Sequence, residues 1–204
     1  MADRVGGRPP APTDQTIARG DWYAADISRL VHERTLFQDA DFDEATGRGA
    51  RFADCTFRGG SFVGAALADC AFENCTFVRC TFLNARLTAC KLIGSMFEDG
   101  TFDQLRVSGG NWSFVGLPGA DLRKAGFTDV RMREVDLTGA RLAGALLTGC
   151  DLGSALWSRA DLTRCDLRGS VLDSLDPTAV QLRGAIIDWP QAATLAVNLG
   201  LDVR

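Results

Sequence analysis

The most constraining feature of this chain of 204 residues is a period of five that runs through most of its length. Every fifth residue from Phe37 to Ile187 is large and apolar, and only Gly47 and Pro177 depart from the rule. A period of five matches neither an α-helix, with 3.6 residues per turn, nor a long strand, with two. The chain therefore repeats one short unit many times without a shift of phase.

Each unit places a small residue two positions before its large apolar centre. Alternate residues of an extended segment point the same way, so both side chains face one interior. The other three positions are dominated by Gly, Asp, Arg, Thr and Asn, which favour turns. One unit cannot bury its inner face alone, but stacked coils bury it and pair their backbones with the coils above and below. The pattern predicts a solenoid.

All seven cysteines occupy the small inner position: Cys55, Cys70, Cys75, Cys80, Cys90, Cys150 and Cys165. Zinc ligation would need thiolate pairs two to four residues apart, and the sequence contains none. If a coil holds twenty residues, Cys55 lies beside Cys75 and the two thiols are near enough to touch. A cytosolic chain disfavours disulfides, and free Cys packs as a small apolar residue. We expect reduced, buried thiols, and no metal or cofactor.

The units Ala120-Asp121-Leu122, Ala160-Asp161-Leu162 and Cys165-Asp166-Leu167 resemble the A(D/N)Lxx pattern of pentapeptide-repeat proteins. The resemblance covers residues 35–189. It implies an all-β fold, a right-handed quadrilateral β-helix with four pentapeptides per coil, followed here by a short C-terminal α-helix. The four-sided closure is implied by the resemblance and not by the period of five.

Short flanking segments narrow the resemblance to the Qnr/MfpA group of topoisomerase-interacting proteins. They are His32-Glu33-Arg34-Thr35-Leu36-Phe37, Leu182-Arg183-Gly184-Ala185, Pro190-Gln191-Ala192 and Leu199-Gly200-Leu201. No loop breaks the repeat, so the chain is more similar to the loopless MfpA type. The resemblance implies a DNA-mimicking partner of DNA gyrase (GyrA/GyrB) that modulates or inhibits supercoiling. It also implies tolerance to fluoroquinolones or to a self-made gyrase poison.

The two ends of the chain differ from the repeat. Residues 1–19 are rich in Gly, Pro and polar residues, which predicts a disordered extension. The β-helix is expected over 20–189, with an irregular first coil at 20–34 because His32 falls where an apolar centre is due. We interpret His32 as the source of a capping hydrogen bond, since the chain has no second His to join it in a site.

Residues 190–204 are expected to form a helix and tail. Asp188 suits the N-cap, Pro190 the first turn and Gly200 the position past the last turn. The helix has one apolar face, which either covers the last coil or joins two subunits. The resemblance implies a homodimer, with these interface residues: Ala192, Leu195, Ala196, Leu199 and Leu201.

Several classes of function are disfavoured by composition. The single His, the lack of a nucleophile paired with a base and the lack of a Gly-rich phosphate loop argue against an enzyme. A net charge of −4 argues against direct binding of nucleic acid, which needs a basic surface. No apolar run is long enough for a signal peptide or membrane span, so a cytoplasmic location is expected.

A rod of roughly eight coils, ~4.8 Å apart, would be ~37 Å long, and a tail-to-tail dimer of ~75 Å would match about 20 base pairs. Acidic side chains on two adjacent sides would meet the Lys and Arg side chains that gyrase uses for phosphates. An ordinary mixed, solvated surface is the alternative for any one of them. The candidate contacts are Asp39, Asp41, Asp43, Glu44, Glu98, Asp99, Asp103, Asp121, Asp136, Asp161 and Asp176.

Two other functions remain open at this stage. One is a scaffold that binds a protein other than gyrase, and the other is a solenoid that binds DNA directly. Distortions are expected where a unit departs from the pattern, either as contact sites or as strain. These units contain Gly47 or Pro177 at the centre, Leu105 or Leu175 at the small position, and the stretch at 109–119.

Overall fold

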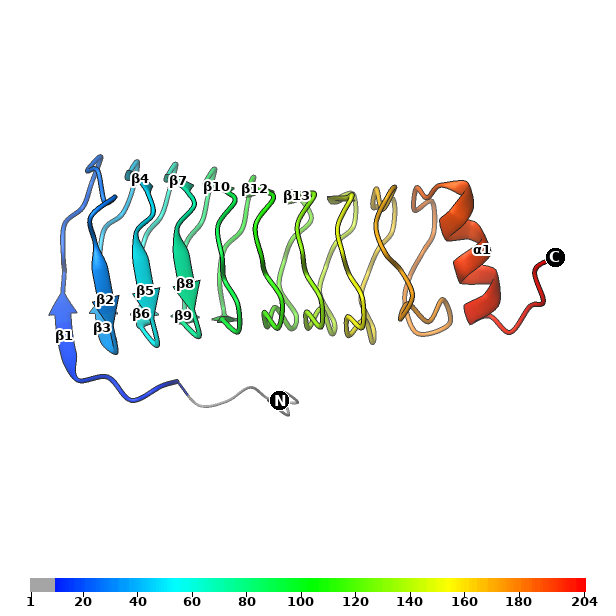
Figure 1. Ribbon diagram of the computed structural model, residues 1–204, viewed down its shortest axis with the longest axis horizontal. Coiled ribbons are helices and arrows are strands. Elements are labelled where there is room, and N and C mark those ends of the chain that lie inside the picture. Colours follow the sequence, from blue (N-terminus) through cyan, green and yellow to red (C-terminus); the bar gives the residue numbers. More distant parts are fainter. Residues whose placement is uncertain (1–9) are drawn as a thin grey trace.

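The protein is a straight rod of stacked coils, described by a computed structural model over residues 10–204. Strand β1 lies at one end of the rod and helix α1 at the other (Figure 1). Residues twenty positions apart pair in parallel, as in Ile17↔Phe37 and Phe57↔Phe77. The expected four-sided β-helix with a short C-terminal helix is confirmed.

Each coil has four sides, and each side is one pentapeptide. We name the faces by their central residues. The first face begins with Ile17, the second with Trp22, the third with Ile27 and the fourth with His32, and each face continues at every twentieth residue. The small inner residue precedes each centre by two positions, as expected.

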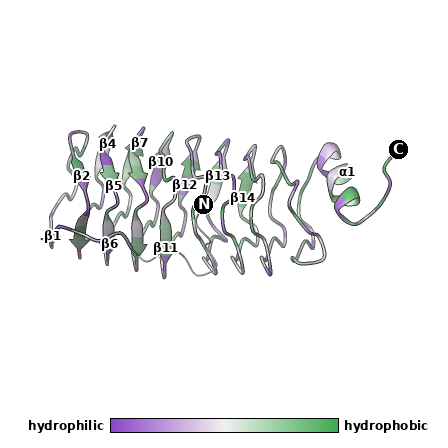
Figure 2. Ribbon diagram, turned by 60° about the horizontal axis from the view of Figure 1, so that its bottom comes forward, coloured by the Kyte–Doolittle hydropathy of each residue, from purple (hydrophilic) through white to green (hydrophobic). Residues whose placement is uncertain are grey.

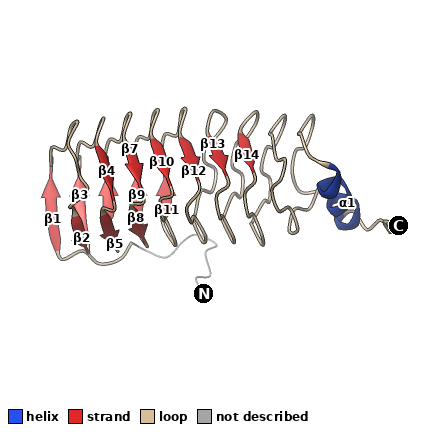
Figure 3. Cartoon of the chain, turned by 45° about the horizontal axis from the view of Figure 1, so that its top comes forward, coloured by secondary structure: helices blue, strands red, loops and turns tan. Residues whose placement is uncertain are grey.

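Three faces carry parallel sheets, and the strands are concentrated in the N-terminal half of the rod (Figure 3). The first face has β1 (Gln15–Ala18), β3 (Thr35–Gln38), β6 (Thr56–Arg58), β9 (Thr76–Val78) and β11 (Met96–Glu98). The third has β4 (Thr46–Arg48), β7 (Ala66–Ala68), β10 (Arg86–Thr88), β12 (Arg106–Ser108), β13 (Gly126–Thr128) and β14 (Leu146–Thr148). The fourth has β2 (Val31–Glu33), β5 (Arg51–Ala53) and β8 (Ala71–Glu73). The second face is joined by single bridges such as Asp41↔Ser61.

The corners of the coils explain the polar residues of the repeat. The last residue of most units has a left-handed backbone, for example Asp39 with φ 51° and Asn74 with φ 53°. Asp, Asn and Gly tolerate this conformation better than other residues. The Asp before a centre often accepts a hydrogen bond from the backbone two residues later, as Asp161 Oδ1 does from Thr163 N at 3.0 Å. Part of the acidic pattern therefore has a structural role.

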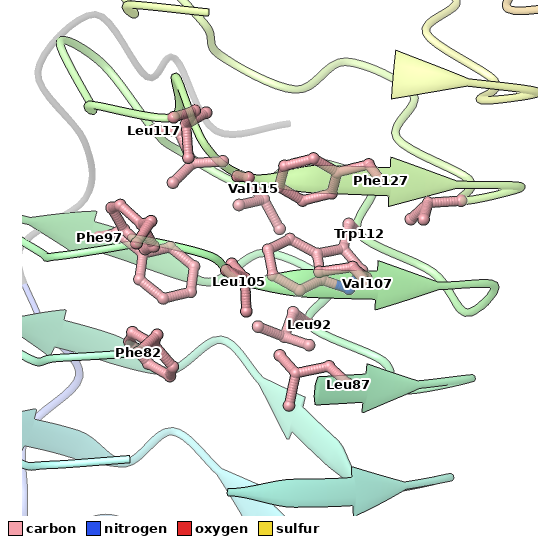
Figure 4. Packing of buried hydrophobic residues seen from close by; sticks show 14 of the residues in the cluster. Phe82, Leu87, Leu92, Phe97, Leu105, Val107, Trp112, Val115, Leu117 and Phe127 are labelled. Atoms are coloured by element: carbon pink, nitrogen blue, oxygen red, sulfur yellow. The ribbon is translucent and has the colours of Figure 1, made fainter. Parts of the chain in front are cut away.

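The interior is a column of apolar side chains that changes character along the rod. Phe37, Phe57, Phe77 and Phe97 stack at centroid distances of 4.7–4.9 Å on the first face. Beyond Trp112 the column becomes mostly aliphatic. Figure 4 shows this transition, where Phe82 and Phe97 give way to Leu105, Val107, Trp112, Val115 and Leu117. Each coil thus buries its inner side chains against the next one.

The seven cysteines are free and buried, as expected from their inner position. Their thiols contact backbone carbonyls of the same and the preceding coil; Cys80 Sγ lies 3.4 Å from the carbonyl oxygen of Phe57. Burial raises the pKa of Cys80 to about 12 and that of Cys150 to about 11. The Cys80 and Cys150 thiols therefore stay protonated, whereas a hydrogen bond with the Cys90 thiol lowers the pKa of Cys70 to about 7.

The start of the β-helix differs from the expectation in two ways. Strand β1 begins at Gln15 and pairs with β3, so residues 15–19 belong to the rod and not to a disordered extension. The segment 20–34 also keeps the twenty-residue register, through Asp21↔Asp41 and β2, and is a regular coil. Residues 1–9 of the expected extension lie outside the described residues.

His32 occupies the central position of its unit, where its imidazole ring packs against the rings of neighbouring units. It lies parallel to Phe52 at 5.9 Å and edge-on to Phe37 at 5.1 Å. Desolvation by partial burial lowers its pKa. An imidazole substitutes here for the phenyl ring of later coils. The ring stacking, and not the expected capping hydrogen bond, explains its place in the sequence.

The irregular units distort the rod only in part. Near Pro177 the register slips by one residue, because Arg159 N donates to Ala179 O where residue 178 is due. Leu105 and Leu175 fit the small inner position and are fully buried. The stretch 109–119 keeps its bridges, such as Asn111↔Arg131. The clear break lies beside this stretch, on the second face between 100–104 and 120–124.

Candidate functional site

The acidic residues of the first coils form one cluster at the N-terminal end of the rod. Asp41, Asp43 and Glu44 lie on the second face, and Asp39 lies at its edge with the first. Asp41 Oδ1 accepts from Asp43 N at 2.8 Å, and Asp43 Oδ1 accepts from Val63 N at 2.7 Å. These bonds fix the direction of both side chains.

Asp21 belongs to the same cluster, although sequence reasoning missed it. It pairs in parallel with Asp41, so the two carboxylates stand on adjacent coils. The unbroken five-residue phase could have placed it there, but the coil at 20–34 was expected to be irregular. We call Asp21, Asp39, Asp41, Asp43 and Glu44 the acidic end. None of the five forms an ion pair with a Lys or Arg of residues 10–204.

Asp103 and Asp121, by contrast, are neutralised by basic residues of their own face. Asp103 Oδ2 lies 3.1 Å from Lys124 Nζ. Asp121 Oδ2 lies 2.7 Å from Arg123 Nη2 and 3.0 Å from Arg141 Nη2. The hydrogen bond from Arg123 is the largest cause that lowers the pKa of Asp121. A basic partner would have to compete with these internal contacts.

The remaining candidates lie apart from the acidic end. Glu98 and Asp99 are exposed three coils further along the first face, and Arg79 lies one coil before Asp99 in the same column. Asp136 is only 8% exposed and accepts from Thr138 N at 2.9 Å. The structure therefore divides the expected acidic strip into one cluster and several isolated groups.

Asp161 and Asp176 act mainly as turn caps. Each accepts a hydrogen bond from a threonine two residues later, at 3.0 Å from Thr163 N and 2.8 Å from Thr178 N. The Thr163 hydroxyl lowers the pKa of Asp161, and the Thr178 hydroxyl lowers that of Asp176. Both carboxylates are thus held by their own turns.

The C-terminal end carries helix α1 (Trp189–Asn198), which covers the last coil. Asp188 is the N-cap, as expected, and Gln191 completes a capping box with it. The Gln191 amide also donates to Leu167 O at 2.6 Å and to Ser170 O at 2.7 Å, while Asn198 Nδ2 donates to Leu175 O at 2.8 Å. The helix is therefore fixed to the rod by polar contacts at both of its ends.

Several apolar residues at this end are exposed, and part of α1 has the green of hydrophobic residues in Figure 2. Of the five expected interface residues, Ala192, Leu195 and Ala196 are half-buried, and Leu195 packs on the core. Leu199 and Leu201 are 52% and 60% exposed. Three further exposed apolar residues were missed because they lie outside the helical stripe: Ile186, Trp189 and Val197. Trp189 is 90% exposed and borders a hollow of 280 Å³.

The described residues contain no helix long and apolar enough to traverse a bilayer. Within the same residues, no three His, Cys, Asp or Glu side chains are grouped as metal ligands would be. The geometry offers binding surfaces at the acidic end, at the apolar C-terminal end and along the faces between them.

Comparison with known families agrees with the repeat geometry. Residues 50–125 match the pentapeptide repeat region family, and residues 117–153 and 140–174 match the pentapeptide repeats (8 copies) family. The chain belongs to the pentapeptide-repeat family. No curated protein matches this pentapeptide-repeat chain.

Two solved pentapeptide-repeat proteins match this chain. A trypsin-treated form of QnrB1, a plasmid-mediated fluoroquinolone resistance protein, is 27% identical; the alignment covers 95% of this chain and 97% of that one, with a TM-score of 0.47. HetL, involved in heterocyst differentiation regulation in the cyanobacterium Nostoc sp. strain PCC 7120, is 20% identical over 89% of this chain and 90% of its own, with a TM-score of 0.35.

Proposed function

We propose that this pentapeptide-repeat protein is a cytoplasmic dimer that binds DNA gyrase in place of DNA. Binding would modulate or inhibit supercoiling and confer tolerance to fluoroquinolones or to a self-made gyrase poison. The acidic end is the observation that carries the proposal, because its five carboxylates are free of ion pairs within the described residues. The flanking segments that resemble the Qnr/MfpA group support gyrase as the partner.

The acidic end reproduces the local spacing of charge on DNA better than the whole chain does. The backbones of adjacent coils are about 4.8 Å apart, so Asp21 and Asp41 repeat a carboxylate at roughly that interval along the rod. Phosphates along one DNA strand are about 3.4 Å apart along the axis. The net charge of −4 is far too small to imitate DNA in bulk. Any mimicry therefore depends on the rigid shape and on this cluster.

The C-terminal end supplies a surface for a second copy of the chain. Trp189, Val197, Leu199 and Leu201 are all more than half exposed on one end of the rod. Such an apolar patch is typical of an interface in a soluble protein. A tail-to-tail dimer would place the two acidic ends at the outer tips of one long rod.

The direct test is a supercoiling assay with purified protein and purified gyrase. We expect inhibition of supercoiling, or protection of gyrase from a fluoroquinolone, at micromolar protein. Absence of both effects would overturn the proposal. A parallel binding measurement on each gyrase subunit separates loss of binding from loss of effect.

A scaffold for a protein other than gyrase is the second candidate. The C-terminal half of the second face favours it, because Asp121 is paired with Arg123 and Arg141 in the mixed pattern of an ordinary protein surface. A pull-down from lysate that enriches one protein but neither gyrase subunit would support this function and contradict the first.

A further inference from the structure

The backbone ladder of the second face is interrupted at one place. Phe82 N donates to Thr101 O at 2.7 Å, and Leu122 N donates to Arg141 O at 2.8 Å. Between 100–104 and 120–124, both fully described, there is no such bond and no bridge. In the register of the other coils, Phe102 N would donate to Asp121 O, Gln104 N to Arg123 O and Asp121 N to Gly100 O. Three N–H groups are thus left without a backbone acceptor.

Three features mark the gap as a local opening of the rod. The Phe82 and Phe102 rings are 5.9 Å apart, whereas Phe62 and Phe82 are 4.9 Å apart. Ala120 is only partly buried, although other alanines at the inner position of this face are fully buried. From residue 34 to residue 169, the last residue of every unit except Lys124 has a left-handed backbone.

Gly100 leaves room for the Phe102 ring beside the opening. A Cβ at Gly100 would lie 2.7 Å from Phe102 Cζ, so the Phe102 ring occupies the space that a side chain fills in other coils. The ring is therefore displaced from the stack of Phe62 and Phe82. The next centre on this face is the smaller Leu122, which does not restore the contact.

The opening forms a pocket of 490 Å³ on the second face. Its wall carries three cationic side chains, Arg123, Lys124 and Arg141, and two carboxylates, Asp103 and Asp121, for a net charge of +1. Asp121 accepts two hydrogen bonds from Arg123 and one from Arg141, and Asp103 accepts one from Lys124. Most N–H groups of the three cations are therefore still available, together with the unpaired backbone amides.

One acceptor in the pocket has no partner. Asp103 Oδ1 is buried and makes no hydrogen bond, while Oδ2 of the same carboxylate binds Lys124. A buried oxygen of this kind is costly unless a donor reaches it. The occupant that completes the pocket must accept several hydrogen bonds and donate at least one.

We propose that this pocket binds a phosphate group that retains a P–OH. The phosphate oxygens accept from Lys124, Arg123 and Arg141 and from the free backbone amides, and the hydroxyl donates to Asp103 Oδ1. Hydrogenphosphate has this hydroxyl at neutral pH, whereas a monoester loses it above about pH 6. Inorganic phosphate is therefore the favoured source, and a monoester binds in its monoanionic form. The gyrase proposal rests on the acidic end, which shares no residue with this pocket, although Asp103 and Asp121 are among the contacts expected from the sequence.

Titration of the labelled full-length protein, followed by amide NMR at constant ionic strength, tests the site. Inorganic phosphate is expected to give saturable shifts at the amides of Phe102, Gln104 and Asp121. Sulfate has the same shape and charge but no hydroxyl, so we expect it to bind about tenfold more weakly. O-phosphoserine is expected to bind near pH 5 and to weaken as it loses its last proton. Absence of shifts at these amides, or uniform shifts along the chain, overturns the proposal.

Two variants separate the roles of the residues. Asp103→Asn places an amide where the acceptor was, and we expect it to abolish the preference for phosphate over sulfate. Lys124→Met is expected to weaken both anions about tenfold, while Arg86→Met on the exposed third face leaves them unchanged. A wild-type protein that binds phosphate and sulfate equally would contradict the role of Asp103. The circular dichroism spectrum of each variant confirms that the rod is folded.

Discussion

Asp188 and Gln191 exchange two hydrogen bonds where the rod ends and α1 begins. Gln191 N donates to Asp188 Oδ1 at 3.1 Å, and Asp188 N donates to Gln191 Oε1 at 2.8 Å. The Gln191 amide nitrogen then donates to Leu167 O and Ser170 O of the last complete coil. One buried side chain therefore caps both the helix and the β-helix.

We expect Gln191→Met to destabilise the protein by roughly 2–3 kcal/mol. The substitution preserves size but leaves the Ser170 carbonyl without a donor and removes half of the capping box. The Leu167 carbonyl loses one of its two donors and keeps Ser170 N. Urea denaturation followed by circular dichroism measures the loss. Gln181→Met is the matched control, because Gln181 is exposed on the second face. Equal stability of the two variants would show that α1 is not held by Gln191.

At the C-terminal end, the sequence predicts the local cap of the helix but not the contacts that hold the helix on the last coil. Asp188, Pro190 and Gly200 were expected from local rules, since a cap depends on residues within one turn. The contacts of Gln191 with Leu167 and Ser170 could not be derived in this way. They span more than twenty residues and depend on where the helix lies on the last coil.

The dimer proposal predicts that charge at the C-terminal end will produce a monomer. Leu199→Asp combined with Leu201→Asp would bury unpaired carboxylates in the interface, which costs several kcal/mol, on the order of the desolvation of a charged group. Sedimentation velocity measures the mass. Tyr23→Asp with Val31→Asp, at the exposed opposite end, should leave the mass unchanged. A wild-type protein that sediments as a monomer at high concentration rejects the dimer.

The acidic end should contribute more to gyrase binding than other carboxylates do. We expect the isosteric set Asp39→Asn, Asp41→Asn, Asp43→Asn and Glu44→Gln to raise the inhibitory concentration by at least about tenfold. The amides still accept the hydrogen bonds that hold the turns. A control set removes the same charge from exposed sites elsewhere: Asp129→Asn, Glu134→Gln, Asp173→Asn and Asp202→Asn. Equal effects of both sets would assign the inhibition to net charge alone.

The sequence predicts the face on which each carboxylate lies, but it does not predict which carboxylates form ion pairs. The five-residue period, together with the four-sided coil that the family resemblance implies, assigns Asp41 and Asp121 to one face. Whether a cation neutralises each of them depends on side-chain directions across neighbouring coils, as for Arg141 and Asp121, which are twenty residues apart. Periodicity carries no information on these directions.

Stability should fall in alkaline solution because three buried thiols, Cys80, Cys150 and Cys165, resist ionisation. Burial raises the pKa of Cys80 and Cys165 to about 12, and that of Cys150 to about 11, above their ordinary value near 9.0. The folded state therefore retains protons that the unfolded state loses above about pH 9. This stabilisation is complete below pH 9 and is lost toward pH 12, by roughly 1.4 kcal/mol per thiol and pH unit. Denaturation series at rising pH measure the slope, and Cys80→Ala with Cys165→Ala should flatten it. An unchanged slope in that variant would contradict the assignment.

The aromatic column predicts that equal substitutions cost more in the N-terminal half of the rod. Phe57 lies between Phe37 at 4.7 Å and Phe77 at 4.9 Å, with all three rings nearly parallel. Phe57→Leu loses both stacked contacts, and we expect it to cost about 1–3 kcal/mol beyond the ordinary loss of volume.

Phe127→Leu is the matched comparison for that prediction. Its ring meets Trp112 edge-on at 5.5 Å, and its neighbours along the third face are Val107 and Leu147. A leucine at 127 continues the aliphatic column, so we expect a cost of about 1 kcal/mol. Chemical denaturation compares the two variants at equal protein concentration. If both lose the same free energy, aromatic stacking adds nothing to the rod beyond apolar burial, and the change from Phe to Leu along the column has no energetic meaning.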